Sequence, residues 1–207
     1  MRYKLPNDLI VFISGVPGVG KTTISYELLK AYKEFRLVEE TDIIREILRG
    51  YTNQLQESYP FISNNIYSHN VFLSYEMARE QCRIMKESIM NIVKRQQRKK
   101  IPSIINGVHI IPEELYLYAP DSSNIIYLNL YIDSEEALWN RLKKRNPQKY
   151  NRECVPLLFK TNVDLKNSFY RIPQDSFKWF SINVSSQSIQ ETLYEIGDFF
   201  YKIYQPI

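Results

Sequence analysis

The sequence lacks several features that define particular classes of protein. Only two of its 207 residues are cysteines, Cys82 and Cys154, too few for a disulfide framework or a structural zinc site. Its longest apolar runs resemble residues 9–13, far short of the roughly 18–20 residues that span a bilayer. Residues 1–6 have no apolar stretch or cleavage site typical of a secretory signal. We therefore expect a reduced, cytoplasmic protein without a membrane segment.

The sequence also has only a small excess of charge of one sign. The formal net charge is +4, from 27 Lys and Arg against 23 Asp and Glu. Such a mild excess suits a small anionic ligand at least as well as a nucleic acid, which usually demands more basic surface, so we expect no nucleic-acid partner. The basic run at 94–100 ends a predicted helix, where positive charge complements the helix dipole. Nothing in the sequence indicates the oligomeric state.

What is present is an alternation of two kinds of segment. Apolar runs suited to buried strands alternate with stretches suited to helices, which predicts one α/β domain with a parallel sheet covered on both faces. Ligands of such folds bind at the carboxyl ends of the strands. The segment from about 153 to 175 has no clear pattern. Strands are predicted near 9–14, 36–40, 102–106, 125–132 and 179–184, and helices near 21–35, 42–48, 64–98, 134–145 (capped by Ser134) and 188–201.

A glycine-rich motif follows the first predicted strand and opens the first predicted helix. It matches G-x-x-x-x-G-K-[ST], the P-loop, whose backbone N–H groups and following helix N-terminus converge on phosphate oxygens. Lys21 can reach the β- and γ-phosphates of a nucleotide, and the Thr22 hydroxyl can hold Mg²⁺. The predicted nucleotide-binding residues are Gly15, Val16, Pro17, Gly18, Val19, Gly20, Lys21, Thr22 and Thr23.

A carboxylate and an arginine follow the second predicted strand. Asp42 is expected at the carboxyl end of this strand, near the phosphates, where it can accept a proton from an attacking hydroxyl. A role in capping the next helix is the alternative, and the two roles are compatible. Arg45 follows one helical turn later and can bind an anionic acceptor.

The third predicted strand ends in Asn106-Gly107, with His109 shortly after. In P-loop enzymes this strand usually ends in an acidic residue that steadies Mg²⁺ or its waters. Asn106 can coordinate a ligand but cannot act as a base. His109 either contacts the acceptor or is a structural hydrogen-bonding residue.

A basic segment follows the fourth predicted strand and its helix. Arg141, Arg145 and Arg152 lie within or next to it. A mobile cationic lid over about 141–155 would neutralise charge in the transition state and exclude water, which competes with the acceptor hydroxyl. The alternative is a solvated basic face. We predict that Arg141 and Arg145 are catalytic, that Arg141 also contacts the nucleotide, and that Arg152 contacts the substrate.

The sequence resembles the P-loop kinases of small molecules, a group related to nucleoside monophosphate, shikimate and gluconate kinases, and most of all the 2-phosphoglycerate kinase-like proteins. The segments 14–23, 41–49 and 105–112 carry this resemblance. It implies a three-layer P-loop fold with strand order 2-3-1-4-5, ATP with Mg²⁺, an acceptor bound within about 42–100 near Asp42 and Arg45, and a lid carrying arginines. The family pattern usually has Glu at the position of Asn106.

The leading prediction is therefore a kinase that transfers the γ-phosphoryl group of ATP to a hydroxyl of a small polar molecule, with anionic molecules among the candidates. Lys21 and Asp42 would be catalytic, while Asp42, Arg45, Asn106, Gly107, His109 and Arg152 would contact the acceptor. Three alternatives stay open: a nucleoside or antibiotic phosphotransferase, a polynucleotide 5′-hydroxyl kinase, and a nucleotide-binding regulator without transfer. The polynucleotide alternative would use stacking aromatics such as Tyr51, Tyr59 and Tyr67.

Overall fold

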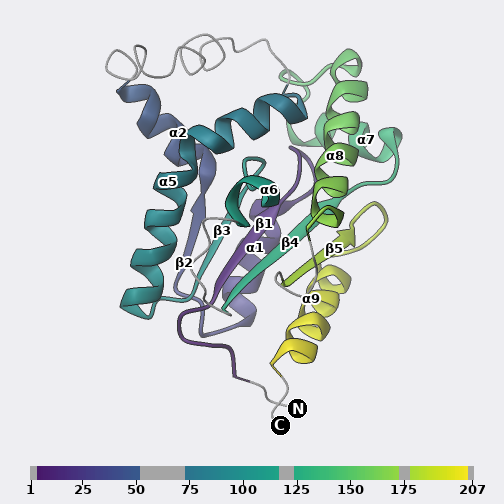
Figure 1. Ribbon diagram of the computed structural model, residues 1–207. Coiled ribbons are helices and arrows are strands. Elements are labelled where there is room, and N and C mark those ends of the chain that lie inside the picture. Colours follow the sequence, from purple (N-terminus) through teal and green to yellow (C-terminus); the bar gives the residue numbers. More distant parts are fainter. Residues whose placement is uncertain (1–3, 52–72, 117–123, 173–177, 205–207) are drawn as a thin grey trace.

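A computed structural model describes residues 4–51, 73–116, 124–172 and 178–204. Its core is a sheet of five parallel strands in the order β2-β3-β1-β4-β5 (Figure 1). This confirms the predicted fold class and strand order. The carboxyl ends of all five strands meet at one edge of the sheet, since parallel strands share one direction. The strands are β1 (Ile10–Ser14), β2 (Leu37–Glu40), β3 (Ser103–Gly107), β4 (Ile125–Tyr131) and β5 (Lys178–Asn183).

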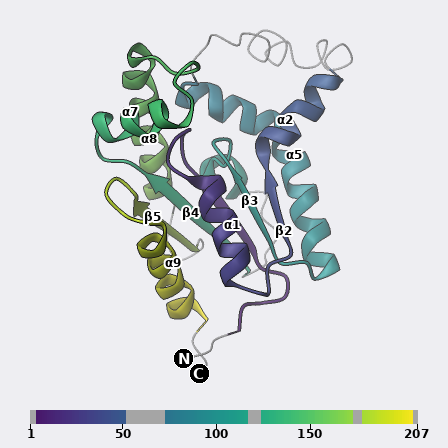
Figure 2. The same ribbon diagram turned by 180° about the vertical axis from the view of Figure 1, so that it is seen from behind.

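Helices cover both faces of the sheet. α1 and α9 lie on the face seen in Figure 2, and α5, α6 and α8 lie on the opposite face (Figure 1). No helix of the described ranges is long and apolar enough to cross a membrane. The helices are α1 (Lys21–Ala31), α2 (Thr41–Gly50), α5 (Tyr75–Lys99), α6 (Pro112–Leu115), α7 (Glu135–Arg145), α8 (Val155–Tyr170) and α9 (Ile189–Ile203), with a short 3₁₀ helix η2 (Arg152–Cys154).

Two long helices, α5 and α8, differ most from the sequence prediction. In addition, α1 ends at Ala31 and not near 35, and the short helix α6 was not predicted. Within the predicted helix 64–98, α5 begins only after Ser74, whose side chain caps Met77 N–H, and residues 64–72 lie outside the described ranges. The second long helix, α8, fills the unassigned segment near 153–175. Its buried face includes Asn162, which exchanges hydrogen bonds with both backbone groups of Ile132. A polar residue on the buried face interrupts the apolar period that marks a helix in the sequence.

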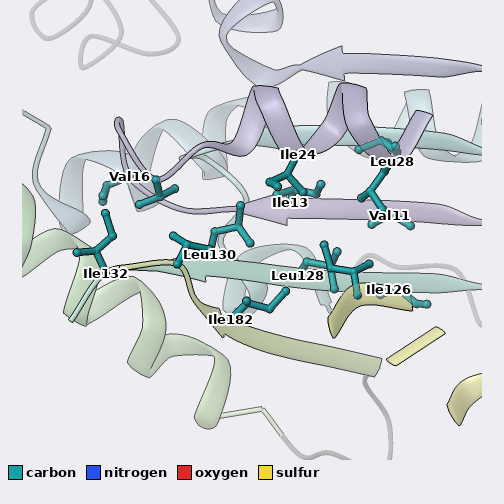
Figure 3. Close-up of a cluster of buried hydrophobic side chains, with 14 of the residues drawn as sticks. Val11, Ile13, Val16, Ile24, Leu28, Ile126, Leu128, Leu130, Ile132 and Ile182 are labelled. Carbon is teal, nitrogen blue, oxygen red and sulfur yellow. The ribbon is translucent and has the colours of Figure 1, made fainter. Parts of the chain in front are cut away.

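The core consists of two apolar clusters, one on each face of the sheet. Successive residues of a strand face opposite sides, so Val11 and Ile13 of β1 pack toward α1 and α9 (Figure 3), whereas Ile10 and Phe12 pack toward α5 and α8. Every residue of β1 is buried. Full burial of an Ile or Phe side chain contributes about 1.5–3 kcal/mol. The loop that follows β1 therefore starts from a fully buried strand at the centre of the sheet.

Candidate active site

The loop between β1 and α1 has the backbone conformation that binds phosphate in P-loop proteins. Gly15, Gly18 and Gly20 all have positive φ angles, of 149°, 93° and 97°. Gly20 occupies the N-cap position of α1 in a left-handed conformation, and no side chain caps the helix there. The first N–H groups of α1 are therefore left to an external acceptor, and the helix dipole favours an anion at this position.

Lys21 folds back over this loop. Its Nζ donates a hydrogen bond to the Val16 carbonyl at 3.0 Å. Burial lowers the pKa of Lys21 to about 8, and the charge of Arg145 acts in the same direction, while Asp42 and Glu40 oppose the shift. An ammonium group held in partly desolvated surroundings gains a strong partner when a triphosphate enters.

A cavity of about 700 Å³ opens over the P-loop and α1. Gly18 to Ile24 form one side, and Thr22 and Thr23 are exposed toward solvent. Glu40, at the end of β2, and Arg145, from α7, also line it. Arg141 and Lys144 of α7 line it as well, and the other lining residues, between 184 and 192, lie from just after β5 to the first turn of α9. Sequence reasoning missed this last segment, because it contains no charged or glycine-rich motif, and it also missed Glu40.

Arg141 joins two parts of this cavity. Its guanidinium donates to the carbonyl of Val19, in the P-loop, at 3.5 Å, and to the carbonyl of Val184, just after β5. Burial lowers the pKa of Arg141. This arginine therefore ties the phosphate-binding loop to the segment that follows β5.

Asp42 lies in the first turn of α2, with its side chain 55% exposed. Its Oδ1 is 3.1 Å from Arg45 Nη2 and 3.9 Å from His109 Nδ1. Partial burial acts to raise the pKa of Asp42, but the charges of His109, Arg45, Lys21 and Lys149 outweigh it, so the pKa lies below its usual value. Asp42 is therefore an ionised, accessible carboxylate beside the P-loop lysine.

His109 is fully buried beneath Asp42. Its Nε2 lies 2.6 Å from Gln81 Oε1, and its Nδ1 lies 3.0 Å from Thr41 Oγ1. Because the Gln81 oxygen only accepts hydrogen bonds, Nε2 carries a proton in both charge states of the ring. Nδ1 accepts from the Thr41 hydroxyl when the ring is neutral and donates to it when the ring is protonated, the state in which His109 acts on Asp42. The structure thus favours the structural alternative for His109, in which it holds the start of α2.

The other sequence-predicted residues differ in position. Asn106 is buried at the end of β3, and Gly107 packs against Thr41 so closely that a Cβ there would lie 1.8 Å from Thr41 Oγ1. Arg152 pairs with Glu136 at 2.6 Å, with its guanidinium 5.7 Å from the Trp139 ring centre, and does not line the nucleotide cavity.

Two groups of predicted residues are therefore brought together. The P-loop, Arg141 and Arg145 surround the cavity. Arg45, Gly107 and His109 gather around Asp42 and its neighbour Thr41. The charges of Lys21 and Asp42 act on each other and so link the two groups. The contacts of Arg152 place it in neither group.

Curated proteins similar to this chain are kinases with phosphorylated compounds in their names. A 2-phosphoglycerate kinase from Methanopyrus kandleri is 28% identical over 142 residues, covering 65% of this chain and 42% of the relative. A mevalonate-3-phosphate 5-kinase from Thermoplasma acidophilum is 28% identical over 152 residues, covering 67% of this chain and 69% of the relative. The matched part spans less than half the length of the 2-phosphoglycerate kinases.

Solved structures share the fold at low sequence identity. A sugar kinase from Janibacter superposes with a TM-score of 0.60 at 15% identity, over 93% of this chain and 94% of the other. A shikimate kinase from Acinetobacter baumannii superposes with a TM-score of 0.57 at 14% identity, over 99% and 97% of the two chains. The family described as "AAA domain" matches residues 11–157. The chain therefore belongs to the AAA domain family, and its resemblance to the P-loop small-molecule kinases is confirmed.

Proposed function

We propose that this protein is an ATP-dependent kinase that transfers the γ-phosphoryl group to a hydroxyl of a small, polar, anionic molecule. One observation carries the proposal: the exposed carboxylate of Asp42 lies within the electrostatic reach of Lys21, the P-loop lysine that lines the nucleotide cavity. A phosphate-binding loop alone indicates a nucleotide. A proton acceptor beside it supports transfer to a hydroxyl group.

The nucleotide end of the site follows from the P-loop. Backbone N–H groups and Lys21 bind the phosphates, and Arg141 braces the loop against the segment after β5. The exposed Thr22 hydroxyl lines the cavity, and a hydroxyl with phosphate oxygens is a donor set that suits Mg²⁺. When bound, Mg²⁺ neutralises charge on the phosphates. Arg145 reaches the same cavity from α7 and stabilises negative charge on the transferred group.

The acceptor end is built around Asp42. Its carboxylate takes the proton of the acceptor hydroxyl while that oxygen bonds to the γ-phosphorus, and ADP leaves with the electrons of the broken bond. Arg45 and Lys149 add positive charge here. The relatives' printed names, 2-phosphoglycerate kinase and mevalonate-3-phosphate 5-kinase, support a phosphorylated acceptor. The acceptor region of about 42–100 belongs to this proposal, although its residues 52–72 lie outside the described ranges.

The lid of about 141–155 also belongs to the proposal. Arg145 and Lys149 lie close enough for their charges to act on Lys21 and Asp42 respectively. Arg152, predicted to contact the substrate, would have to leave Glu136 to do so. Of the aromatic residues named for the polynucleotide alternative, Tyr51 is 58% exposed just after the end of α2, and Tyr59 and Tyr67 lie outside the described ranges.

An acceptor screen tests the proposal. ADP release would be measured over a panel of phosphorylated hydroxy acids, sugars, nucleosides and 5′-hydroxyl oligonucleotides, and the product would be identified by mass spectrometry. We expect acceptor-dependent turnover with a phosphorylated hydroxy acid. Asp42→Asn should lower turnover about 100-fold or more without lowering ATP affinity. Asp198→Asn, in α9, is the matched control. Unchanged turnover in Asp42→Asn would remove the base assignment.

A further inference from the structure

The end of β3 lacks the carboxylate that P-loop enzymes commonly use beside Mg²⁺. Asn106 occupies this position, with only 2% of its surface exposed. Its Nδ2 has no hydrogen-bond partner within the described part of the chain. An amide carries no negative charge, so Asn106 cannot offset the charge of a cation. Some other group would have to supply that charge.

Glu40 lies directly beside Asn106 on the neighbouring strand. The two residues are partners in the parallel pairing of β2 and β3, which puts their side chains on the same face of the sheet. Two residues earlier, the partners Val38 and Ile104 pack into the cluster beneath α1. Glu40 and Asn106 therefore share the α1 face, the face from which Lys21 emerges.

The surroundings of Glu40 agree with this placement. Its side chain lines the nucleotide cavity together with Thr22, and its charge acts on Lys21. The preceding residue provides a contrast, because Glu39 faces the other side of the sheet. There Glu39 Oε1 accepts a hydrogen bond from Gln96 Nε2 of α5 at 3.1 Å. Of these two adjacent acidic residues, only Glu40 has its side chain on the nucleotide cavity.

We propose that Glu40 supplies the carboxylate that orients Mg²⁺ or its bound waters. In this protein the metal-orienting carboxylate would then stand at the end of β2, whereas P-loop enzymes commonly carry it at the end of β3. The inference rests on the proposed function, since it concerns the same nucleotide site. It explains how a chain with Asn106 keeps a negative group opposite Thr22.

Nucleotide binding with and without metal tests this placement. Calorimetry on the full chain would give the affinity for ATP in Mg²⁺ and in EDTA, and the ratio of the two is the metal-linked gain. Glu40→Gln should lower this gain about 10-fold to 100-fold, as removal of an orienting carboxylate does in other metal sites. Affinity for metal-free ATP should rise, because a negative charge beside the phosphates is lost. Glu39→Gln should leave the gain unchanged.

A second variant, in which the carboxylate is placed at position 106, separates loss of the metal effect from misfolding of Glu40→Gln. Because positions 40 and 106 share a face, Glu40→Gln combined with Asn106→Asp should recover much of the gain, and Glu40→Asp should keep most of it. Circular dichroism would check that each variant is folded. A Glu40→Gln protein that keeps the wild-type gain would overturn the inference and leave the proposed kinase intact. A wild-type protein that binds no nucleotide would overturn both.

Discussion

Replacing Gly107 with alanine puts a methyl group into space that Thr41 already fills. The new Cβ would lie 1.8 Å from Thr41 Oγ1, 2.9 Å from its Cβ and 3.1 Å from its Cγ2. Thr41 is fully buried and cannot rotate away into solvent. Overpacking of this kind costs about 1–3 kcal/mol. For a chain of this size, that cost lowers Tm by about 2–4 °C for each kcal/mol.

The displacement also reaches the proposed base. Thr41 is the first residue of α2, and its hydroxyl binds His109, so movement of Thr41 carries Asp42 with it. We expect Gly107→Ala to lower turnover more than it lowers ATP affinity, measured by steady-state kinetics and calorimetry beside thermal unfolding. Gly50→Ala is the matched control, because a Cβ at Gly50 meets nothing within 4 Å.

A double-mutant cycle isolates the contact. Thr41→Ala removes the atom nearest to the added methyl group, so the two substitutions together should destabilise the protein less than the sum of the single effects. Strict additivity, or a Gly107→Ala protein as stable and as active as Gly50→Ala, would refute the reasoning. Either result would mean that Gly107 is not needed for the close approach of β3 and α2.

Three further predictions concern ionisation. Above pH 8, ATP binding should be accompanied by uptake of a proton, because the triphosphate raises the lowered pKa of Lys21. Calorimetry in buffers of different ionisation enthalpy measures this uptake. Lys21→Met should abolish it. Glu114→Ala should cost about 1–3 kcal/mol in urea unfolding. Burial acts to raise the pKa of Glu114, but hydrogen bonds and charges from Arg79 and Arg83 outweigh burial, so the pKa is lowered. Glu114 therefore stabilises the fold above pH 4.5, and the destabilisation caused by Glu114→Ala should vanish in acid. For Asp42, the pH–rate profile of kcat, which reports the nucleotide complex, should fall in acid at a higher pH than the profile of kcat/KM for ATP, which reports the free enzyme.

The sequence predicted the sheet well because β1, β3 and β4 are short runs rich in apolar residues that are buried almost throughout. Residues that lie close together in the sequence were also easier to find: the P-loop residues are contiguous, and Asp42 comes two residues after β2 ends. The helix α8 was missed because Thr161 and Asn162 lie on its buried face and make hydrogen bonds there. A helix is recognised in a sequence by the spacing of its apolar residues, and polar residues that are buried with hydrogen-bond partners interrupt this spacing.

What the sequence could not predict depends on contacts between distant segments. Glu40 becomes notable only when the strand register puts it beside Asn106. The sequence leaves two roles open for His109, and its bond to Gln81, 28 positions earlier, favours the structural one. Val184 acquires its role from Arg141, which is 43 residues away. Such pairings follow from packing, and one sequence contains no direct record of packing.

The charge balance of the cleft explains the expected behaviour of Asp42. In the free protein, the charges of His109, Arg45, Lys21 and Lys149 hold the pKa of Asp42 below its usual value despite partial burial, which makes the carboxylate a weak base. A bound triphosphate brings negative charge into the same field and weakens the pull of Lys21. The pKa of Asp42 should then rise. Asp42 would therefore become a better proton acceptor only once the phosphoryl donor is in place, which links nucleotide binding to deprotonation of the acceptor.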